Sequence, residues 1–157
     1  MLKSISRVSR LSFLVLVSLV CIACSSNAKV VTELNQTYRG SRVNITALEI
    51  KSVELPKLDS GDEMVVLVKF AIENTTKSDE YACIYSASVD GMETSDSFWQ
   101  DALVNSEKKI SVIITPGKRA EGYLGAVVPK GTKTIEFRVA DIGAQNKYAV
   151  FLLDTPE

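Results

Sequence analysis

The 157-residue sequence contains no histidine, and this limits the chemistry open to it. Serine and cysteine nucleophiles of the common hydrolases need an imidazole to take up their proton, and many zinc sites use imidazole nitrogen as a ligand. Histidine-dependent sites of both kinds are therefore excluded. The groups that remain for chemistry are one Ser-x-x-Lys spacing, two groups of carboxylates and three cysteines.

The Ser-x-x-Lys spacing is Ser106-Glu-Lys-Lys109. In penicillin-recognising enzymes this spacing places a lysine one helical turn from a serine nucleophile, and Ser-Asp-Asn and Lys-Thr-Gly elements complete the site. Here the spacing precedes a predicted strand, and neither of the other elements follows it. We interpret the segment as a charged turn, and we predict no catalytic residue and no enzymatic activity.

The carboxylates could supply the hard oxygen ligands that calcium prefers. The two groups are Asp59, Asp62 and Glu63, and then Asp90, Glu93 and Asp96. Neither group has the Asp-x-Asp-x-Asp-Gly spacing of a calcium loop, and acidic turns are common on solvated surfaces. We predict no metal site and no cofactor.

The N-terminal segment has the features of an export signal. Lys3, Arg7 and Arg10 precede an apolar run from Leu11 to Ala23, without an acidic residue. The run is shorter than the roughly 20 apolar residues that cross a bilayer as a helix. We therefore predict a signal peptide over residues 1–23.

Cys24 follows this segment directly, and Ile22-Ala23-Cys24 resembles the lipobox of bacterial lipoproteins, with Cys21 where leucine is usual. The resemblance implies that Cys24 becomes the first mature residue and carries diacylglycerol, with palmitate among the acyl chains. Such chains anchor a protein at about 0.8 kcal/mol per buried methylene. The alternative is an ordinary cleaved secretory signal with two incidental cysteines.

The resemblance also implies a location at the extracytoplasmic face of the cell membrane. In a cell with an outer membrane, Ser25 and Ser26 after Cys24 resemble the pattern of lipoproteins sent onward to that membrane. The signal holds three positive charges and no negative ones, so its removal moves the formal net charge from −1 to −4. An acidic mature chain argues against a nucleic-acid partner.

The mature chain divides into a spacer and one domain. Residues 24–41 are mostly small and polar without a sustained hydrophobic period, so we predict a lipidated N-terminus and a flexible tether there. Residues 42–157 are the size of a single domain with one core. Once Cys24 is lipidated, Cys83 is the only thiol left, so no disulfide can form within the domain. We expect Cys83 to be a small buried side chain.

Most of the domain has the two-residue hydrophobic period of half-buried strands, separated by turns rich in glycine, proline and asparagine. Val66, Val68, Phe70 and Ile72 share one face of a strand, and Tyr148, Val150 and Leu152 share one face of the last strand. Six or seven short strands indicate an all-β antiparallel sandwich. The expected strands are 42–53, 64–74, 110–114, 123–127, 135–139 and 148–152.

Residues 95–104 are the exception, because Asp96 is placed to cap a short helix that carries Phe98, Trp99, Ala102 and Leu103. Phe98 and Trp99, together with Tyr123, are the candidate residues for binding a partner, since aromatic side chains bury much area for little entropy. The alternative is that Trp99 fills the core where the helix packs on the sandwich.

The stretches VVLVKFAIENTTKSDEY and ITPGKRAEGYLGAVVPKGTKTIEFRV, separated by an Asp90-Gly91 turn, resemble a known family. It is the immunoglobulin-like domain of unknown function found in bacterial surface lipoproteins, similar to telokin and to a mycobacterial secreted immunogen. The resemblance implies an immunoglobulin-like (telokin-like) sandwich in the cell envelope, and it supplies no catalytic residue. The expected function is a protein-binding module of the envelope; the alternative is a carrier of lipid or glycan, held between splayed sheets.

Overall fold

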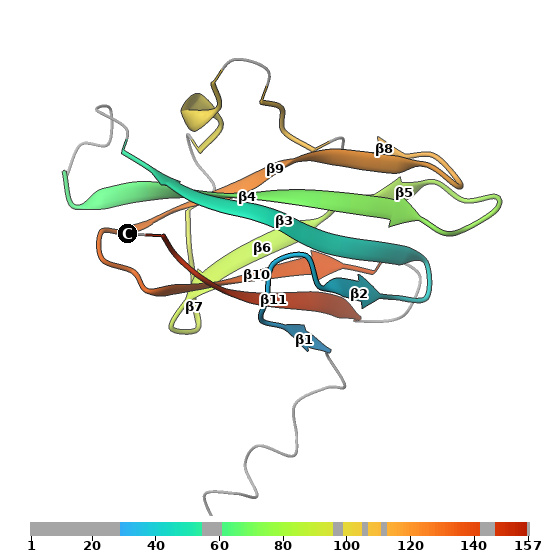
Figure 1. Ribbon diagram of the computed structural model, residues 1–157, viewed down its shortest axis with the longest axis horizontal. Helices are drawn as coiled ribbons and strands as arrows, with labels where there is room; N and C mark the ends of the chain where they lie inside the picture. The colour runs from blue at the N-terminus through green and yellow to red at the C-terminus, as the bar shows by residue number, and fades with distance from the viewer. Residues whose placement is uncertain are drawn as a thin grey trace, which may run out of the picture.

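The computed structural model describes residues 29–54, 61–95, 99–104, 107–110, 113–141 and 147–156. Within these ranges most residues lie in β-strands and no α-helix is present, which confirms the predicted all-β class (Figure 1). The elements are β1 (Val30–Val31), β2 (Thr37–Arg39), β3 (Val43–Val53), β4 (Glu63–Asn74), β5 (Tyr81–Ala82), β6 (Tyr85–Val89), β7 (Met92–Glu93), the 3-10 helix η1 (Trp99–Ala102), β8 (Ile113–Ile114), β9 (Arg119–Pro129), β10 (Thr134–Ala140) and β11 (Tyr148–Asp154).

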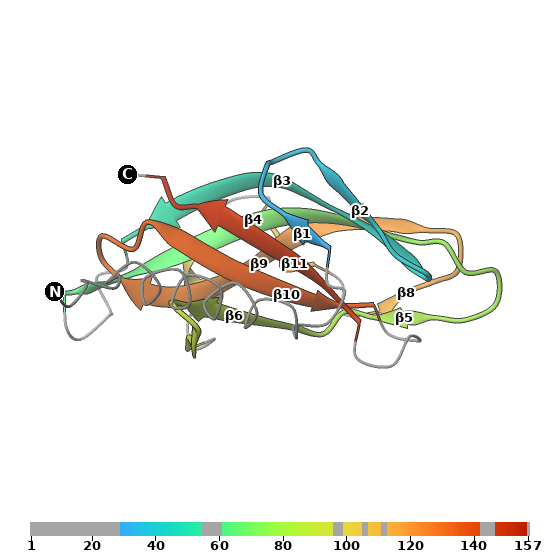
Figure 2. The ribbon, with the colours of Figure 1, turned by 90° about the horizontal axis from the view of Figure 1, so that it is seen from below.

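The strands form two stacked sheets and one small extra pair. The five-stranded sheet has the order β1-β11-β10-β6-β7, and the four-stranded sheet has the order β2-β3-β4-β9. β5 and β8 pair separately at one end of the sandwich. Figures 1 and 2 show the two large sheets as layers, with β10 and β11 on one side and β3 and β4 on the other. All strand pairs are antiparallel except β1 with β11.

The main core lies between the two layers, where alternate side chains of both sheets meet. The ring of Phe70 on β4 packs edge-on against Phe137 on β10 and Phe151 on β11, with centroid distances of 5.9 and 5.1 Å. Val66 and Val68 point to the same side as Phe70 and are also fully buried. The prediction that Val66, Val68, Phe70 and Ile72 share one face of this strand is therefore confirmed.

A second, smaller core lies on the opposite face of the four-stranded sheet. Val65, Leu67 and Val127 project there and are covered by Trp99 and Ala102 of η1. Figure 1 places η1 over β9 on the side away from β10 and β11. β4 and β9 are therefore buried on both faces, and this is why both of their alternating sets are apolar.

The expected helix over 95–104 is a single 3-10 turn of four residues, Trp99–Ala102. Asp96 and Phe98, which were expected to cap it and to lie on it, fall outside the described residues. Leu103 donates a backbone hydrogen bond to the carbonyl of Gln100, an i to i−3 contact. Four residues suffice to place Trp99 on the sheet without a regular α-helix.

Two strands lie in the segment expected to be a tether. β1 pairs with β11 in the register Val30–Val150 and Val31–Phe151, and Val31 is fully buried. β2 pairs with β3, and Tyr38 packs into the main core. The sequence places the end of the spacer at residue 41, whereas the folded part of the chain already includes Val30. Val31 and Tyr38 are the two buried residues of this segment, so its composition is polar although β1 and β2 are paired.

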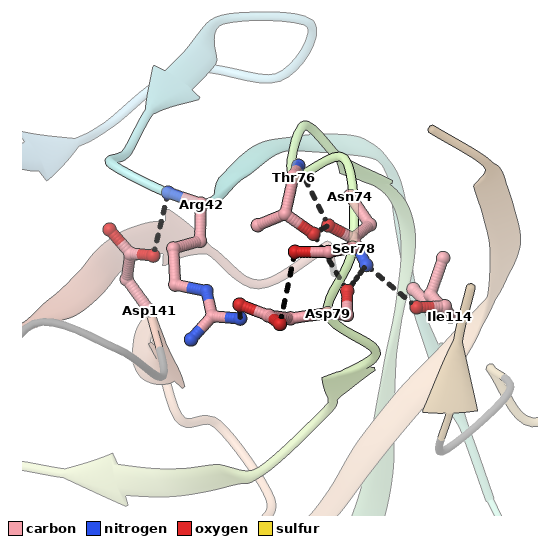
Figure 3. A network of polar contacts seen from close by, with 7 residues as sticks. All are labelled: Arg42, Asn74, Thr76, Ser78, Asp79, Ile114 and Asp141. Carbon is pink, nitrogen blue, oxygen red and sulfur yellow. Dashed lines mark hydrogen bonds and ion pairs between the residues drawn. The ribbon is translucent and has the colours of Figure 1, made fainter. Parts of the chain in front are cut away.

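One end of the sandwich is held by the side chain of Asn74, which is fully buried (Figure 3). Its Nδ2 donates to the carbonyls of Asp79 and Ile114, both at 2.8 Å, and its Oδ1 accepts from the backbone N–H and hydroxyl of Thr76. Its backbone N–H and carbonyl bond to Lys118 and Gly117. A single residue thus joins the end of β4 to the β4–β5 loop, to β8 and to the turn before β9.

Asp141 is the second fully buried polar residue, and it lies near the same end. Its carboxylate accepts hydrogen bonds from the backbone N–H and hydroxyl of Ser41 and from the backbone N–H of Arg42. A Cβ on Gly40 would lie 2.4 Å from Asp141 Oδ2, so only glycine fits there. The β2–β3 turn is therefore fixed to the end of β10, about 100 residues later in the chain.

Candidate protein-interaction face

The outward face of the five-stranded sheet carries an apolar stripe along β11. Because successive side chains of a strand alternate between the faces, the burial of Ala149, Phe151 and Leu153 in the main core turns Tyr148, Val150 and Leu152 outward. The sequence period predicts that Tyr148, Val150 and Leu152 share one face of the strand, and in the structure this is the face that points away from the main core. We call this surface, with Val30 and Ile84, the β11 face.

Val30 and Ile84 extend the stripe across neighbouring strands. Val30 is the register partner of Val150 on β11. Ile84, directly before β6, accepts a hydrogen bond at its carbonyl from the N–H of Ala140. Ala140 is in turn the register partner of Tyr148, so Ile84 and Tyr148 lie in the same row across the sheet. Val30 is 50% exposed, Ile84 58%, Tyr148 41% and Leu152 40%. Single exposed apolar residues are ordinary, but these four lie in adjacent rows on one side of the molecule, with the buried Val150 and Ala140 between them.

Polar groups flank the stripe on β10 and β6. Arg138 Nε donates to Glu136 Oε1 at 2.6 Å, and Ser88 Oγ lies 3.4 Å from the same oxygen. A shallow hollow of about 150 Å³ opens beside Leu152. Its other lining residues are Ser88, Asp90, Gly91, Thr134 and Glu136. An apolar centre with a polar margin and a small depression is the anatomy of a protein-binding surface.

Trp99 and Tyr123, two of the aromatic residues predicted to bind a partner, lie in the second core. Trp99 is 1% exposed and Tyr123 6%. The ring of Trp99 lies under the ammonium group of Lys109, 5.7 Å from the ring centroid. In this arrangement both rings contact the chain's own residues, as in the alternative that assigned Trp99 to the core. The other two predicted residues, Cys24 and Phe98, lie outside the described residues.

The hydroxyl of Tyr123 joins a charged cluster on the four-stranded sheet. It donates to Glu49 Oε2 at 3.2 Å, and Lys51 lies over its ring, 5.2 Å from the centroid. Burial, followed by the nearby charges of Glu49 and Glu107, raises the pKa of Tyr123 to about 12. Lys51 also pairs with Glu107 and so lowers the pKa of that carboxyl. The cluster fastens the segment after η1 to the sheet.

Cys83 is half-buried against the main core. Burial raises the pKa of its thiol to about 11, although the charge of Lys109 acts in the opposite direction. A thiol with so high a pKa is almost entirely protonated at neutral pH and is a poor nucleophile. The position agrees with the expectation that Cys83 fills space rather than reacts.

Four of the six carboxylates weighed as calcium ligands can be placed: Asp62, Glu63, Asp90 and Glu93. Asp59 and Asp96 lie outside the described residues. Over the part of the chain that the structure covers, no three acidic or cysteine side chains gather closely enough to hold a metal ion. In the same ranges, no helix has the length and apolar character needed to cross a membrane.

No protein-family profile and no curated protein sequence matches this chain. Among solved structures, the chain is similar to the crystal structure of the yjhA protein from Bacillus subtilis, with 13% sequence identity and a TM-score of 0.47. The match covers 80% of this chain and 100% of the other.

Proposed function

We propose that this protein is a lipid-anchored, extracytoplasmic binding module of the bacterial envelope, which contacts a protein partner through the β11 face. The observation that carries the proposal is the group of exposed apolar side chains Val30, Ile84, Tyr148 and Leu152 on the outward side of one sheet. Removing exposed apolar side chains from water is favourable, so binding of a partner over them lowers the free energy. The proposal includes no catalytic activity and no cofactor.

The anchor part of the proposal rests on the N-terminal sequence. Basic residues, a short apolar run and Ala23 before Cys24 are the reasons to assign a lipidated cysteine, and the folded chain includes β1 from Val30. Replacing Cys24 by alanine should remove the acyl chains. Comparison of intact masses from a membrane fraction tests this: the wild type should carry the added mass of the acyl chains on Cys24, and a mass difference between the two proteins equal to the substitution alone would reject the anchor.

For the fold, we infer an immunoglobulin-like, telokin-like sandwich from the strand order. In one sheet the neighbours β3-β4-β9 correspond to strands A-B-E of an immunoglobulin sandwich. In the other sheet the neighbours β7-β6-β10-β11 correspond to strands C′-C-F-G. η1 and β8, which lie between β7 and β9 along the chain, are found where a regular strand D would be. The β11 face is then the outward face of the C-F-G sheet, a broad surface that loops do not cover in the described residues.

In-cell crosslinking of the full-length tagged protein, followed by mass spectrometry, tests the binding function. We expect a discrete partner with the wild type, and loss of that partner in the double variant Tyr148→Glu/Leu152→Glu. Val104→Glu is the matched control, because Val104 is also apolar and 54% exposed but follows η1, which covers the other sheet. Cys24→Ala is the control for location.

The outcomes separate binding from anchoring. A partner retained by Tyr148→Glu/Leu152→Glu would move the interface away from the β11 face, and no partner beside abundant, correctly anchored protein would reject the proposal. The remaining alternative is then a carrier of lipid or glycan, which extraction of the purified protein would reveal. In the described residues, aromatic rings fill the space between the two sheets, so the structure gives no reason to prefer that alternative.

A further inference from the structure

A polar hollow lies on the opposite side of the molecule from the β11 face, on the outward face of the four-stranded sheet. Its volume is about 310 Å³. The lining residues come from all four strands: Thr37 and Arg39 from β2, Asn44 and Thr46 from β3, Ala71 and Glu73 from β4, and Arg119 from β9. Of these seven, Ala71 alone is apolar, and it is only 4% exposed.

The strand register arranges these residues in two rows across the sheet. Thr37 is paired with Thr46, and Thr46 with Ala71, in the first row. The second row is Arg39, Asn44, Glu73 and Arg119, each opposite the next. The small side chain of Ala71 therefore forms the floor between hydroxyl groups on one side and charged groups on the other.

Most of the polar groups already form a hydrogen bond or an ion pair, either with one another or with a neighbouring residue. The hydroxyls of Thr37 and Thr46 are 2.8 Å apart, and Asn44 Nδ2 donates to Glu73 Oε2 at 2.9 Å. Arg119 forms an ion pair with Glu121 at 2.7 Å. A ligand would meet groups that need little reordering, and this reduces the entropic cost of binding.

Arg39 differs from the other charged groups of the hollow. Its side chain is exposed, and no hydrogen bond or ion pair of its guanidinium is found with any residue that the structure describes. The fork of N–H donors on a guanidinium fits a carboxylate through two parallel hydrogen bonds. On the β2 side, the hollow thus presents a guanidinium whose N–H donors face solvent.

We propose that this hollow binds a sugar acid, that is, a sugar ring that bears a carboxylate. The carboxylate lies against Arg39, and the ring lies over Ala71. Ring hydroxyls donate to the free lone pairs of Glu73 and exchange hydrogen bonds with the hydroxyls of Thr37 and Thr46. A neutral sugar would leave Arg39 without its partner, and a simple carboxylate would leave the hydroxyl row unused, so the lining selects for both groups together.

Saturation-transfer difference NMR tests this with sodium glucuronate as the probe and the full-length chain in detergent micelles. We expect saturation of the ring protons of glucuronate by the wild type and at least a tenfold weaker affinity for Arg39→Gln. Thr46→Val, which removes only the hydroxyl, should also weaken binding. Arg138→Gln is the matched control: Arg138 is an exposed arginine on a β-strand as well, but it lies on the other sheet.

Glucose and sodium acetate at equal concentration and ionic strength complete the experiment. We expect no saturation of glucose and no displacement of glucuronate by acetate. Absence of a glucuronate signal would overturn the proposal, and so would equal affinity of the wild type and Arg39→Gln. Displacement by acetate would overturn it in favour of a bare anion contact. Because Arg39 and the β11 face lie on different sheets, loss of the sugar acid and loss of a protein partner are separate results.

Discussion

Asn74 illustrates how a single side chain can determine the geometry of a sandwich end. A buried amide has two donors and one acceptor oxygen to satisfy, and here two segments of the chain, the β4–β5 loop and β8, supply the partners. Backbone groups could not replace it, because the end of β4, the following loop and β8 do not run side by side as strands. The network in Figure 3 therefore depends on a residue that the sequence marks only as a turn former.

We predict that Asn74→Ala lowers the free energy of unfolding by about 3 kcal/mol. The substitution removes the side-chain bonds and leaves the buried carbonyl of Ile114 without its donor, and each buried unsatisfied group costs about 1–3 kcal/mol. Urea denaturation followed by tryptophan fluorescence measures this. Asn44→Ala is the control, since its single side-chain bond to Glu73 is exposed; its cost should stay below about 1 kcal/mol. Equal costs would show that the network is not what holds this end.

Cys83 gives a prediction about pH. With the pKa of its thiol raised by burial to about 11, each unit above the ordinary value lowers the thiolate fraction tenfold. We expect alkylation of Cys83 by iodoacetamide at pH 8 to be about a hundredfold slower in the native protein than in the unfolded protein. The native rate should still rise with pH between 8 and 10. Labelling followed by mass spectrometry in the Cys24→Ala background gives the rates, and similar native and unfolded rates would refute the assignment.

At the scale of elements, η1 acts as a cover for one face of β4 and β9. The two strands project apolar side chains to both sides, and the main core can bury only one set. Trp99 and Ala102 of η1 cover Val65, Leu67 and Val127 of the other set. The charged cluster around Tyr123 then fastens the segment after η1 at the margin of this cover.

We predict that Trp99→Ala destabilises the protein by about 3–5 kcal/mol, the usual cost of removing a large buried side chain. The expected readout is a lower midpoint in thermal unfolding followed by circular dichroism. Val104→Ala, a few residues later and 54% exposed, should change the midpoint little. Unchanged stability of Trp99→Ala with loss of the crosslinked partner would instead place Trp99 in an interface.

The period of two predicts the main strands well, because it depends only on local alternation between core and solvent. It does not identify which face is inward when both carry apolar residues. Tyr148, Val150 and Leu152 have as regular a period as Ala149, Phe151 and Leu153, and only the packing against Phe70 shows that the second set is inside. The polar hollow around Arg39 was not predictable either, since its lining residues are brought together by pairing of four strands.

For the whole molecule, the sequence predicted the all-β class, but it placed the first strand too late. β1 and β2 contain only two and three residues, and their side chains alternate between core and solvent, so no hydrophobic run marks them. Their partners are β11 at the far end of the chain and β3. Contacts between such distant segments carry no local signal.

We predict that a chain beginning at residue 29 retains the stability of the full-length chain, whereas one beginning at residue 42 loses at least about 3 kcal/mol. The longer deletion removes two buried side chains, Val31 and Tyr38, and exposes the edges of β11 and β3. Urea denaturation of the two shortened chains and of the full-length chain gives the free energies of unfolding from the midpoint and the denaturant dependence of each. Equal midpoints would mean that residues 29–41 are a spacer after all.

The parallel pairing of β1 with β11 also sets where this protein can meet other molecules. Val30 is six residues after Cys24, and six residues span at most about 20 Å. With acyl chains on Cys24, as proposed, the edge of the β11 face stays within that distance of the lipid headgroups. A partner must then reach the face at the membrane surface itself. Encounters become a search in two dimensions, and they favour partners that reside in the same leaflet over those that diffuse freely through the envelope.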